Sequence, residues 1–203
     1  SINNGVDDIN KVTDGLMYKY DFTYADAVAE YTWNVSDKLS IRPGLNYQSA
    51  KFDDSKYLDP YIGVFNKEVS NSSFAGSLRM DCSPIEALRF VGAVRLDNFS
   101  SAPDNYVSYQ LASTYKIGKS LVRANVSRAN SGSFLGHAYL NIPFGSSPFV
   151  GNTDLKLFTV NMIEVGFRSN ITDNLQLDVE VFNQKAENFI GLTTVDGSSI
   201  KYQ

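Results

Sequence analysis

With 203 residues, of which 43% are hydrophobic and 20% charged, the chain has the composition of one folded domain rather than of a disordered segment. The formal net charge of −4 argues against nucleic acid as a partner, because phosphate binding needs a concentrated basic face. The single cysteine, Cys82, excludes an intrachain disulfide. The 12 Tyr and 13 Phe residues favour strands over helices.

Residues 1–15 are rich in Gly, Asn and Asp, and we expect a loop there. From residue 16 onward apolar and polar residues alternate, which is typical of strands with one apolar and one polar face. We predict an all-β fold, an antiparallel meander of about 8 to 10 strands, over residues 16–24, 27–35, 39–48, 74–82, 88–97, 107–115, 122–127, 159–169 and 175–184. The tail after residue 186 can begin a further strand. Pro43 lies inside one run and cannot donate a ladder hydrogen bond there.

The connections between these strands alternate between short and long. Tight turns are expected at 36–38, 83–86, 117–120 and 170–174, and long connections at 50–72, 98–105 and 129–158. The tight turns therefore fall at one end of the sheet and the long loops at the other, as in outer-membrane barrels. The turn at 170–174 predicts that Arg168 lies near Gln176 and Glu164 near Glu180.

The two faces of the predicted strands differ in charge. The apolar face carries no charged residue along the clear strands, which suits contact with lipid. Charges of the other face are expected to line a wet lumen: Glu30, Arg42, Arg79, Asp81, Arg89, Arg95, Asp97, Arg123, Glu164, Arg168, Asp178 and Glu180. Strands of about ten residues, tilted by roughly 40°, rise through the apolar band of a membrane. Four aromatic residues near short turns suit an interfacial girdle: Tyr31, Trp33, Tyr115 and Phe167.

Motifs of the common enzyme classes are absent, so we expect no catalytic site and no cofactor. Asp53, Asp54 and Asp59 match no known calcium loop, and we expect no metal site. Glu164 and Glu180 are better explained by a ladder of ion pairs with Arg168 and Asp178 than by paired-carboxylate catalysis.

The long loops are where a ligand would bind, because a rigid sheet can hold such loops in place. Aromatic residues and the sole histidine of these loops can stack on a ligand, although packing within the loops is an equally good explanation for each. The candidates are Tyr57, Tyr61, Phe65, His137, Tyr139, Phe144 and Phe149.

The segment 151–158, Gly-Asn-Thr-Asp-Leu-Lys-Leu-Phe, resembles the Gly-Asn-Pro-(Asp/Glu)-Leu-Lys-Pro-Glu pattern before a late barrel strand of TonB-dependent outer-membrane receptors. Gly151, Asn152, Asp154, Leu155 and Lys156 match it, whereas Thr153, Leu157 and Phe158 depart from it. Upstream, Arg128-Ala129-Asn130 resembles the start of the Arg-Ala-Asn-Arg-Ser-Pro segment of that family, with Ser131 and Gly132 in place of Arg and Ser.

The resemblance implies a bacterial outer-membrane location and energy-coupled uptake of a siderophore, cobalamin, glycan or similar nutrient. Its implied partners are outer-membrane lipid, the TonB complex through a plug region, and a small ligand such as a metal chelate or glycan. We expect residues 1–203 to be a part of the barrel domain, without the plug and the carboxyl-terminal strands. The alternatives are a soluble or surface-attached β-sandwich that binds glycan or protein, and a general porin.

Overall fold

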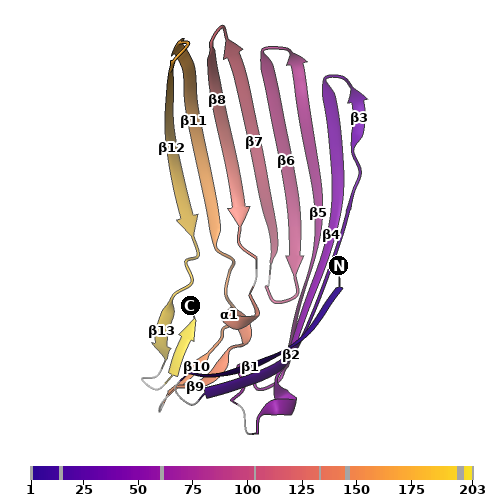
Figure 1. The fold of residues 1–203 in the computed structure, drawn as a ribbon, viewed down its shortest axis with the longest axis vertical. Coiled ribbons are helices and arrows are strands. Elements are labelled where there is room, and N and C mark those ends of the chain that lie inside the picture. Colours follow the sequence, from indigo (N-terminus) through magenta and orange to yellow (C-terminus); the bar gives the residue numbers. More distant parts are fainter. Residues whose placement is uncertain are drawn as a thin grey trace.

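The structure is a computed structural model that describes residues 2–13, 16–59, 62–102, 104–132, 134–144, 147–195 and 199–202. Most of these residues belong to one ten-stranded antiparallel sheet (Figure 1). Its strands are β1 (Ile2–Thr13), β2 (Leu16–Glu30), β3 (Trp33–Ser36), β4 (Leu39–Asp53), β5 (Glu68–Ile85), β6 (Leu88–Phe99), β7 (Asn105–Ile117), β8 (Ser120–Asn130), β11 (Thr159–Thr172) and β12 (Leu175–Glu187). They pair in the order β1-β2-β4-β5-β6-β7-β8-β11-β12, with β3 paired to β4, so the predicted meander is confirmed.

Four two-residue turns connect the hairpins at one end of this sheet, at 37–38, 86–87, 118–119 and 173–174. Gly118 has φ +58° in the third turn, a left-handed conformation that glycine adopts without steric cost. Neighbouring hairpins are joined at this end by backbone hydrogen bonds from Ser83 N to Lys38 O (2.8 Å), Lys116 N to Ala87 O (2.8 Å) and Asn170 N to Lys119 O (3.2 Å). The longer connections all lie at the opposite end, as predicted (Figure 1).

The amino-terminal prediction is wrong. Residues 2–13 form β1, which pairs with β2 from Ile2 opposite Ala25 to Ile9 opposite Tyr18. The polar composition of this segment predicted a loop. In the structure its backbone N–H and C=O groups pair with those of β2, and this pairing could not be seen in the side-chain pattern. The predicted strands 16–24 and 27–35 are likewise divided differently, because β2 runs through to Glu30 and β3 begins at Trp33.

Pro43 explains the break between β2 and β3. Both segments keep one register with β4, in which Glu30 lies opposite Gly44 and Trp33 opposite Ile41. Tyr31 N donates to Pro43 O at 3.1 Å, but Pro43 has no N–H to return the bond. The ladder is therefore interrupted at this level, without a change of register.

The register of the β11–β12 hairpin also differs from the prediction. Arg168 lies opposite Asp178, not Gln176, and Glu164 lies opposite Phe182, not Glu180. The strand continues through Asn170 and Thr172, with an irregularity between them, and turns only at residues 173–174. A shorter turn shifts every pair of the hairpin by two residues.

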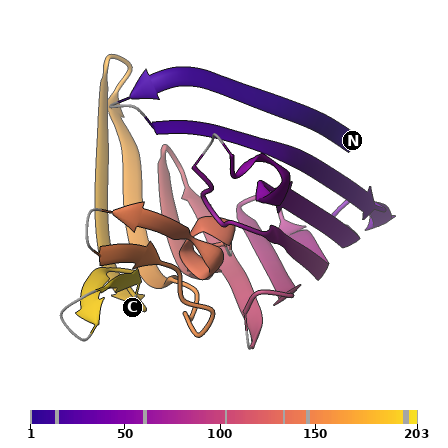
Figure 2. The same cartoon turned by 90° about the horizontal axis from the view of Figure 1, so that it is seen from below.

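A second, four-stranded sheet lies at the long-loop end (Figure 1). It comprises β9 (Asn141–Phe144), β10 (Ser147–Val150), β13 (Leu192–Val195) and β14 (Ser199–Tyr202), in the order β13-β14-β10-β9, with β10 and β14 parallel. The 3₁₀ helix η1 (Ser55–Tyr57) and the helix α1 (Leu135–Tyr139) accompany it. The connections predicted at 50–72 and 98–105 are shorter than expected, because strands occupy both of their ends. The β1–β2 hairpin bends across this end of the molecule (Figures 1 and 2).

No helix among the described residues is long and apolar enough to cross a membrane.

The apolar face of the main sheet is exposed. Val181 is 70% exposed, and Leu111 and Ile163 are each 57% exposed. The four aromatic residues predicted near the short turns are exposed on this face as well. Charged residues also lie on this face by register, toward the long-loop ends of the strands: Lys19, Asp21, Lys51, Asp53, Glu68, Arg128, Lys185 and Glu187. Within the described residues the second sheet does not cover the apolar face, contrary to the sandwich alternative.

Candidate functional site at the long-loop end and on the charged face

Asp54 organises the connection between β4 and β5. Its side chain is only 1% exposed and accepts hydrogen bonds from the backbone N–H groups of Val64 (2.6 Å), Phe65 (2.8 Å) and Lys67 (3.0 Å). A carboxylate that accepts several backbone N–H bonds compensates for its burial. Phe65 is 6% exposed and packs edge-on against Phe52, so its ring belongs to the core of this loop.

The same loop is joined to the β1–β2 hairpin by a cluster of charges beyond the apolar band. Lys56 Nζ lies 2.8 Å from Asp21 and 3.4 Å from Asp53, and the Tyr57 hydroxyl donates to Asp21 at 2.8 Å. Hydrogen bonds from Lys56 and then Tyr57 lower the pKa of Asp21, and the same contact with Asp21 raises the pKa of Lys56 and of Tyr57. Lys19 stands 5.1 Å from the centre of the Tyr57 ring. Tyr57 therefore joins the loop to the hairpin.

The residues that match the family pattern hold α1 in place. Gly151 N donates to Leu140 O at 2.7 Å, and a Cβ at Gly151 would stand 2.5 Å from the carbonyl carbon of Ala138. Asn152 N donates to His137 O at 2.7 Å, and Asn152 Nδ2 donates to Tyr202 O at 3.0 Å. Asp154 N donates back to Asn152 Oδ1 at 3.1 Å, closing an Asx turn.

The last two matching residues, Leu155 and Lys156, line a small hollow next to Phe134 and His137. The family pattern thus has a structural role at this end, which the sequence alone did not indicate.

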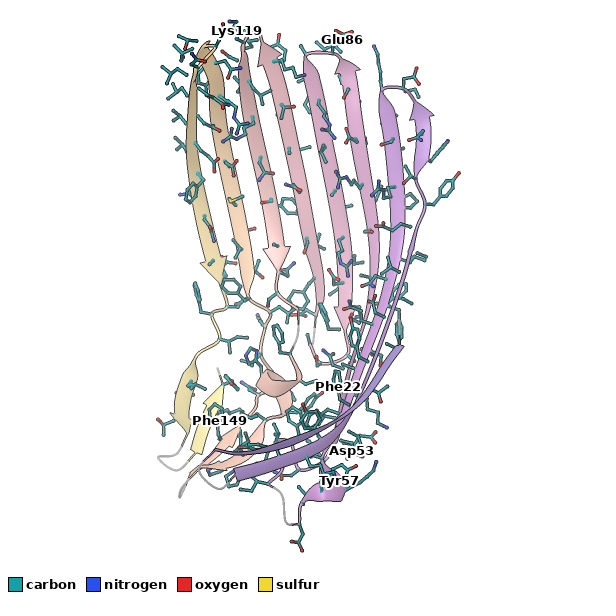
Figure 3. The ribbon with its side chains drawn as sticks, in the orientation of Figure 1. Phe22, Asp53, Tyr57, Glu86, Lys119 and Phe149 are labelled. Atoms are coloured by element: carbon teal, nitrogen blue, oxygen red, sulfur yellow. The ribbon has the colours of Figure 1, made fainter. Side chains whose placement is uncertain are left out.

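Aromatic side chains collect where α1 meets the second sheet. The His137 ring lies 4.8 Å from Tyr202 and 5.5 Å from Phe134, and Phe149 lies 5.3 Å from Tyr202, all between ring centroids. Lys67 Nζ lies over the Tyr139 ring, 5.4 Å from its centre. Figure 3 shows Phe149 and Tyr57 at the long-loop end, opposite Glu86 and Lys119 in the short turns. The structure thus brings His137 and Phe149 together around Tyr202, and places Tyr57 and Phe65 in the neighbouring loop.

Two further candidates cannot be placed in this way. Tyr61 lies outside the described residues, and Phe144 is described by its backbone only, as the last residue of β9.

Two exposed aromatic rings were missed as candidates by the sequence analysis. Phe134 is 60% exposed next to His137, and Phe189 is 70% exposed and packs 5.1 Å from Phe158. Both lie outside the clear periodic strands, so alternation gave no signal for them. Their position after predicted strands, in connections facing the long-loop end, was the available clue.

All twelve predicted charges lie on one face of the main sheet by register. Arg123 is the centre of a network on β8, β11 and β12. Its guanidinium lies 2.7 Å from Glu180, 2.9 Å from Asp178 and 3.8 Å from Glu164. Gly166 makes room for this side chain, because a Cβ there would stand 2.4 Å from Arg123 Nε. Arg168 completes the network at 2.6 Å from Asp178. The four residues of the predicted ladder all form ion pairs, but Glu164 and Glu180 pair with Arg123 and not with Arg168.

The other charges of this face form smaller groups. Arg89 pairs with Asp81, and Arg95 Nε lies 2.7 Å from Asp97 while its Nη2 donates to Asn46 at 3.1 Å. Arg42 donates through Nε to Thr32 Oγ1 at 3.1 Å. In the described part of the chain, no group of three or more His, Cys, Asp or Glu side chains is arranged to hold a metal ion.

A staggered antiparallel meander with an exposed apolar face, a charged opposite face and all long connections at one end defines the wall of a transmembrane β-barrel. The chain belongs to the family described as TonB dependent receptor-like, beta-barrel, whose model matches residues 2–202. It is accordingly a bacterial outer-membrane protein of a family of receptors and transporters. No curated protein matches the sequence.

Solved structures share the fold at low sequence identity. The siderophore receptor PirA from Pseudomonas aeruginosa is 16% identical, with a TM-score of 0.76, over 92% of this chain and 38% of that one. A mutant of the ferric enterobactin receptor PfeA from Pseudomonas aeruginosa is 14% identical, with a TM-score of 0.74, over 99% of this chain and 35% of that one. The copper transporter OprC is 14% identical, with a TM-score of 0.69, over 99% of this chain and 37% of that one. The chain thus spans little more than a third of these relatives.

Proposed function

We propose that this chain is part of the barrel wall of a receptor that imports a small nutrient with energy from the TonB complex. The observation that carries the proposal is the division of the sheet into an exposed apolar face and a face that carries all twelve predicted charges, with every long connection at one end. The apolar face contacts outer-membrane lipid, and the charged face lines the lumen. A plug region, outside residues 1–203, contacts the TonB complex.

The aromatic side chains at the long-loop end, where α1 meets the second sheet, are the proposed place of first contact with the nutrient. Phe134 presents an exposed ring, and His137 and Phe149 pack close behind it around Tyr202. Tyr57 and Tyr139 lie on the adjacent connection and on α1. Aromatic faces bind flat or aromatic ligands through stacking and bind cations through their negative π face.

A metal chelate is the nutrient we favour among the classes that the family resemblance implies. The similar solved structures are described as a siderophore receptor, a ferric enterobactin receptor and a copper transporter. Cobalamin and glycans are the remaining classes.

The test is uptake by the full-length receptor in a strain that lacks its own siderophore receptors. We expect growth on ferric siderophores under iron limitation, and loss of that growth when TonB is deleted. Phe134→Ser should weaken binding of the chelate about tenfold, because it removes a contact residue that contributes about 1.4 kcal/mol to the binding free energy. Asp173→Asn, in a short turn at the opposite end, is the matched control. Failure of every chelate tested to support growth, with a folded receptor in the membrane, would refute the nutrient class.

A further inference from the structure

Two non-glycine residues in the described part of the chain have a left-handed backbone, Asn66 at φ +59° and Asn188 at φ +57°. This conformation costs free energy for a residue with a side chain, although Asn tolerates it better than most residues do. Such positions persist where surrounding contacts hold them, and they are common near functional sites. The contacts of Asn66 therefore indicate its role.

Asn66 lies in the loop between β4 and β5, which runs beside α1 and β9 (Figure 2). Its side-chain Nδ2 donates to the backbone O of Asn141, the first residue of β9, at 2.6 Å. Asn141 N in turn donates to Val64 O in the same loop at 2.8 Å. We refer to these two hydrogen bonds as the Asn141 clasp. Through it a loop and a strand that are distant in the sequence hold each other.

The loop on one side of the clasp is itself fixed. The buried carboxylate of Asp54 accepts hydrogen bonds from the backbone N–H groups of Val64 at 2.6 Å, Phe65 at 2.8 Å and Lys67 at 3.0 Å. These bonds hold the backbone on both sides of Asn66. Asn66 therefore presents its amide to β9 from a fixed backbone, at little further cost in conformational entropy.

The helix α1, on the other side of the clasp, depends on outside contacts for its position. It has only five residues, and the hydrogen bond at its carboxyl-terminal end, from Leu140 N to Gly136 O, is 3.2 Å long. Helices of this length are not stable on their own in water. The chain runs from Leu140 directly into Asn141, so the clasp holds this end of α1 against the β4–β5 loop.

Two side chains of the proposed nutrient site are connected to the clasp. His137 lies on α1, shortly before Asn141. Phe149 lies on β10 and is the cross-strand partner of Ile142, the residue after Asn141. The rings of His137 and Phe149 both pack against Tyr202, at 4.8 and 5.3 Å between ring centroids. Their arrangement therefore depends on where α1 and β9 are held.

We propose that Asn66 is a positioning residue of the nutrient site. Through Asn141 it fixes the places of His137 and Phe149, and it does not touch the nutrient itself. This inference rests on the proposed function. The hydrogen bond from Asn66 to Asn141 is exposed, so water competes for it. Loss of one such bond should shift the equilibrium between the clasped and the open form about fivefold toward the open form.

The first test uses the full-length receptor in detergent without ligand. Asn66→Gly keeps the left-handed backbone without steric cost and removes only the amide. We expect hydrogen exchange of the Leu140 and Asn141 amides, measured by mass spectrometry, to become about fivefold faster, because exchange follows local opening. Asn188→Gly is the matched control. It removes a hydrogen bond from Nδ2 to Leu157 O at 3.1 Å from the same backbone conformation, and it should leave these two amides unchanged.

The second test measures binding of a ferric siderophore that supports growth of the strain carrying the receptor. Asn66→Gly should weaken binding about two- to fivefold, because the apparent affinity falls with the fraction of the clasped form and by no more than opening increases. Asn66→Asp has no side-chain N–H and should behave in the same way. Phe149→Ala should weaken binding too. Added to it, Asn66→Gly should have less than its separate effect, whereas a general loss of stability would add in full.

Four outcomes in a receptor that is folded by heat-modifiable migration would overturn the proposal. They are unchanged exchange at Leu140 and Asn141 in Asn66→Gly, unchanged affinity despite faster exchange, full additivity with Phe149→Ala, and a loss of affinity larger than the increase in opening. The last outcome would make Asn66 a direct contact of the chelate. Because exchange is measured without ligand, failure of every chelate to bind would refute the proposed nutrient class and leave the clasp result intact.

Discussion

Arg168 donates two hydrogen bonds to a single oxygen of Asp178 across the β11–β12 hairpin, at 2.8 Å from Nε and 2.6 Å from Nη2. The other oxygen of Asp178 accepts a hydrogen bond from Arg123 on β8 at 2.9 Å. One carboxylate thus connects three strands of the charged face. Charges that share partners in this way lose less conformational entropy per ion pair than isolated surface pairs.

Removal of that carboxylate should weaken the barrel. Asp178→Ala leaves Arg168 without a carboxylate and Arg123 with Glu180 and Glu164 only. We expect the free energy of unfolding of the full-length receptor in detergent, measured by urea titration, to be lower than that of the wild type. Asp173→Ala is the control, since that side chain is 95% exposed and its contact with Lys119 is 3.5 Å long. Equal stability of the two variants would contradict a role for the network.

The exposed apolar face should not tolerate charge. Val179→Arg or Leu177→Arg places a cation on the exposed apolar face, which we propose contacts lipid. A charge there costs about 2–4 kcal/mol near mid-membrane, so either variant should abolish assembly in the outer membrane. Gln176→Arg lies on the charged face and should assemble normally. Heat-modifiable migration of the full-length protein reports the result. Equal tolerance on both faces would argue against a lipid-facing surface.

Gly151 should be the position of the family pattern that is most sensitive to a small substitution. In Gly151→Ala the new Cβ would stand 2.5–2.6 Å from backbone atoms of Ala138 and Tyr139, which cannot move independently of α1. Overpacking of this kind costs about 1–3 kcal/mol. We expect faster proteolysis between residues 131 and 158 in the full-length receptor, with unchanged barrel assembly. Gly132→Ala is the control, because its Cβ would meet open space.

The β1–β2 hairpin should detach from the β4–β5 loop in acid. The pKa of Asp21 is lowered by hydrogen bonds from Lys56 and Tyr57, and that of Asp53 by a hydrogen bond from the Ser55 hydroxyl. The stability that these two carboxylates contribute to the folded state is therefore fully present above their unfolded pKa near 3.8. It is lost as the pH falls through their lower pKa values in the folded state. Hydrogen exchange of β1 amides, corrected for intrinsic rates, should show protection at pH 5 and less of it at about pH 3. Asp21→Asn should show the weaker protection at both pH values.

Residues 1–203 expressed alone should not remain a free monomeric sheet. The strand edges and the apolar face would then be uncovered, and both promote association. Light scattering in detergent-free buffer should show oligomers or aggregates. A stable monomer that binds an apolar dye strongly would contradict this expectation, because it would keep the face exposed without associating.

Much of the main sheet could be predicted from the sequence, because alternation of side chains reports directly on a sheet with two different faces. The turns at 37–38 and 118–119 were expected for the same reason, at the places where alternation stops. The turn at 173–174 was misplaced because Asn170 and Thr172 are common in turns, yet here they extend β11. A short polar stretch does not show whether the backbone ladder ends before it or after it.

The parts that could not be predicted depend on contacts between distant segments. β1 has a polar composition and exists through its pairing with β2. The second sheet joins β10 to β14, some fifty residues apart, through strands of four residues that are too short to show a period. At the loop end, Asp54 was considered as a metal ligand and rejected. In the structure it accepts hydrogen bonds from three backbone N–H groups, and this role depends on a loop conformation that sequence patterns do not specify.

The steps between neighbouring hairpins at the short-turn end have a consequence for the width of the barrel. β5 extends three residues beyond Cys82, which is the partner of Leu39 at the start of β4. β7 extends two residues beyond Tyr115, the partner of Leu88 at the start of β6. β11 extends three residues beyond Ser169, the partner of Ser120 at the start of β8. Together these steps make eight residues of shear over six strands. At about 3.3 Å per residue and 4.8 Å between strands, this shear corresponds to strands inclined by roughly 40° if the turns lie in one plane. Each strand then occupies about 6.4 Å of the barrel circumference, compared with 4.8 Å for strands without tilt. The stagger alone therefore increases the barrel diameter by roughly a third for the same number of strands.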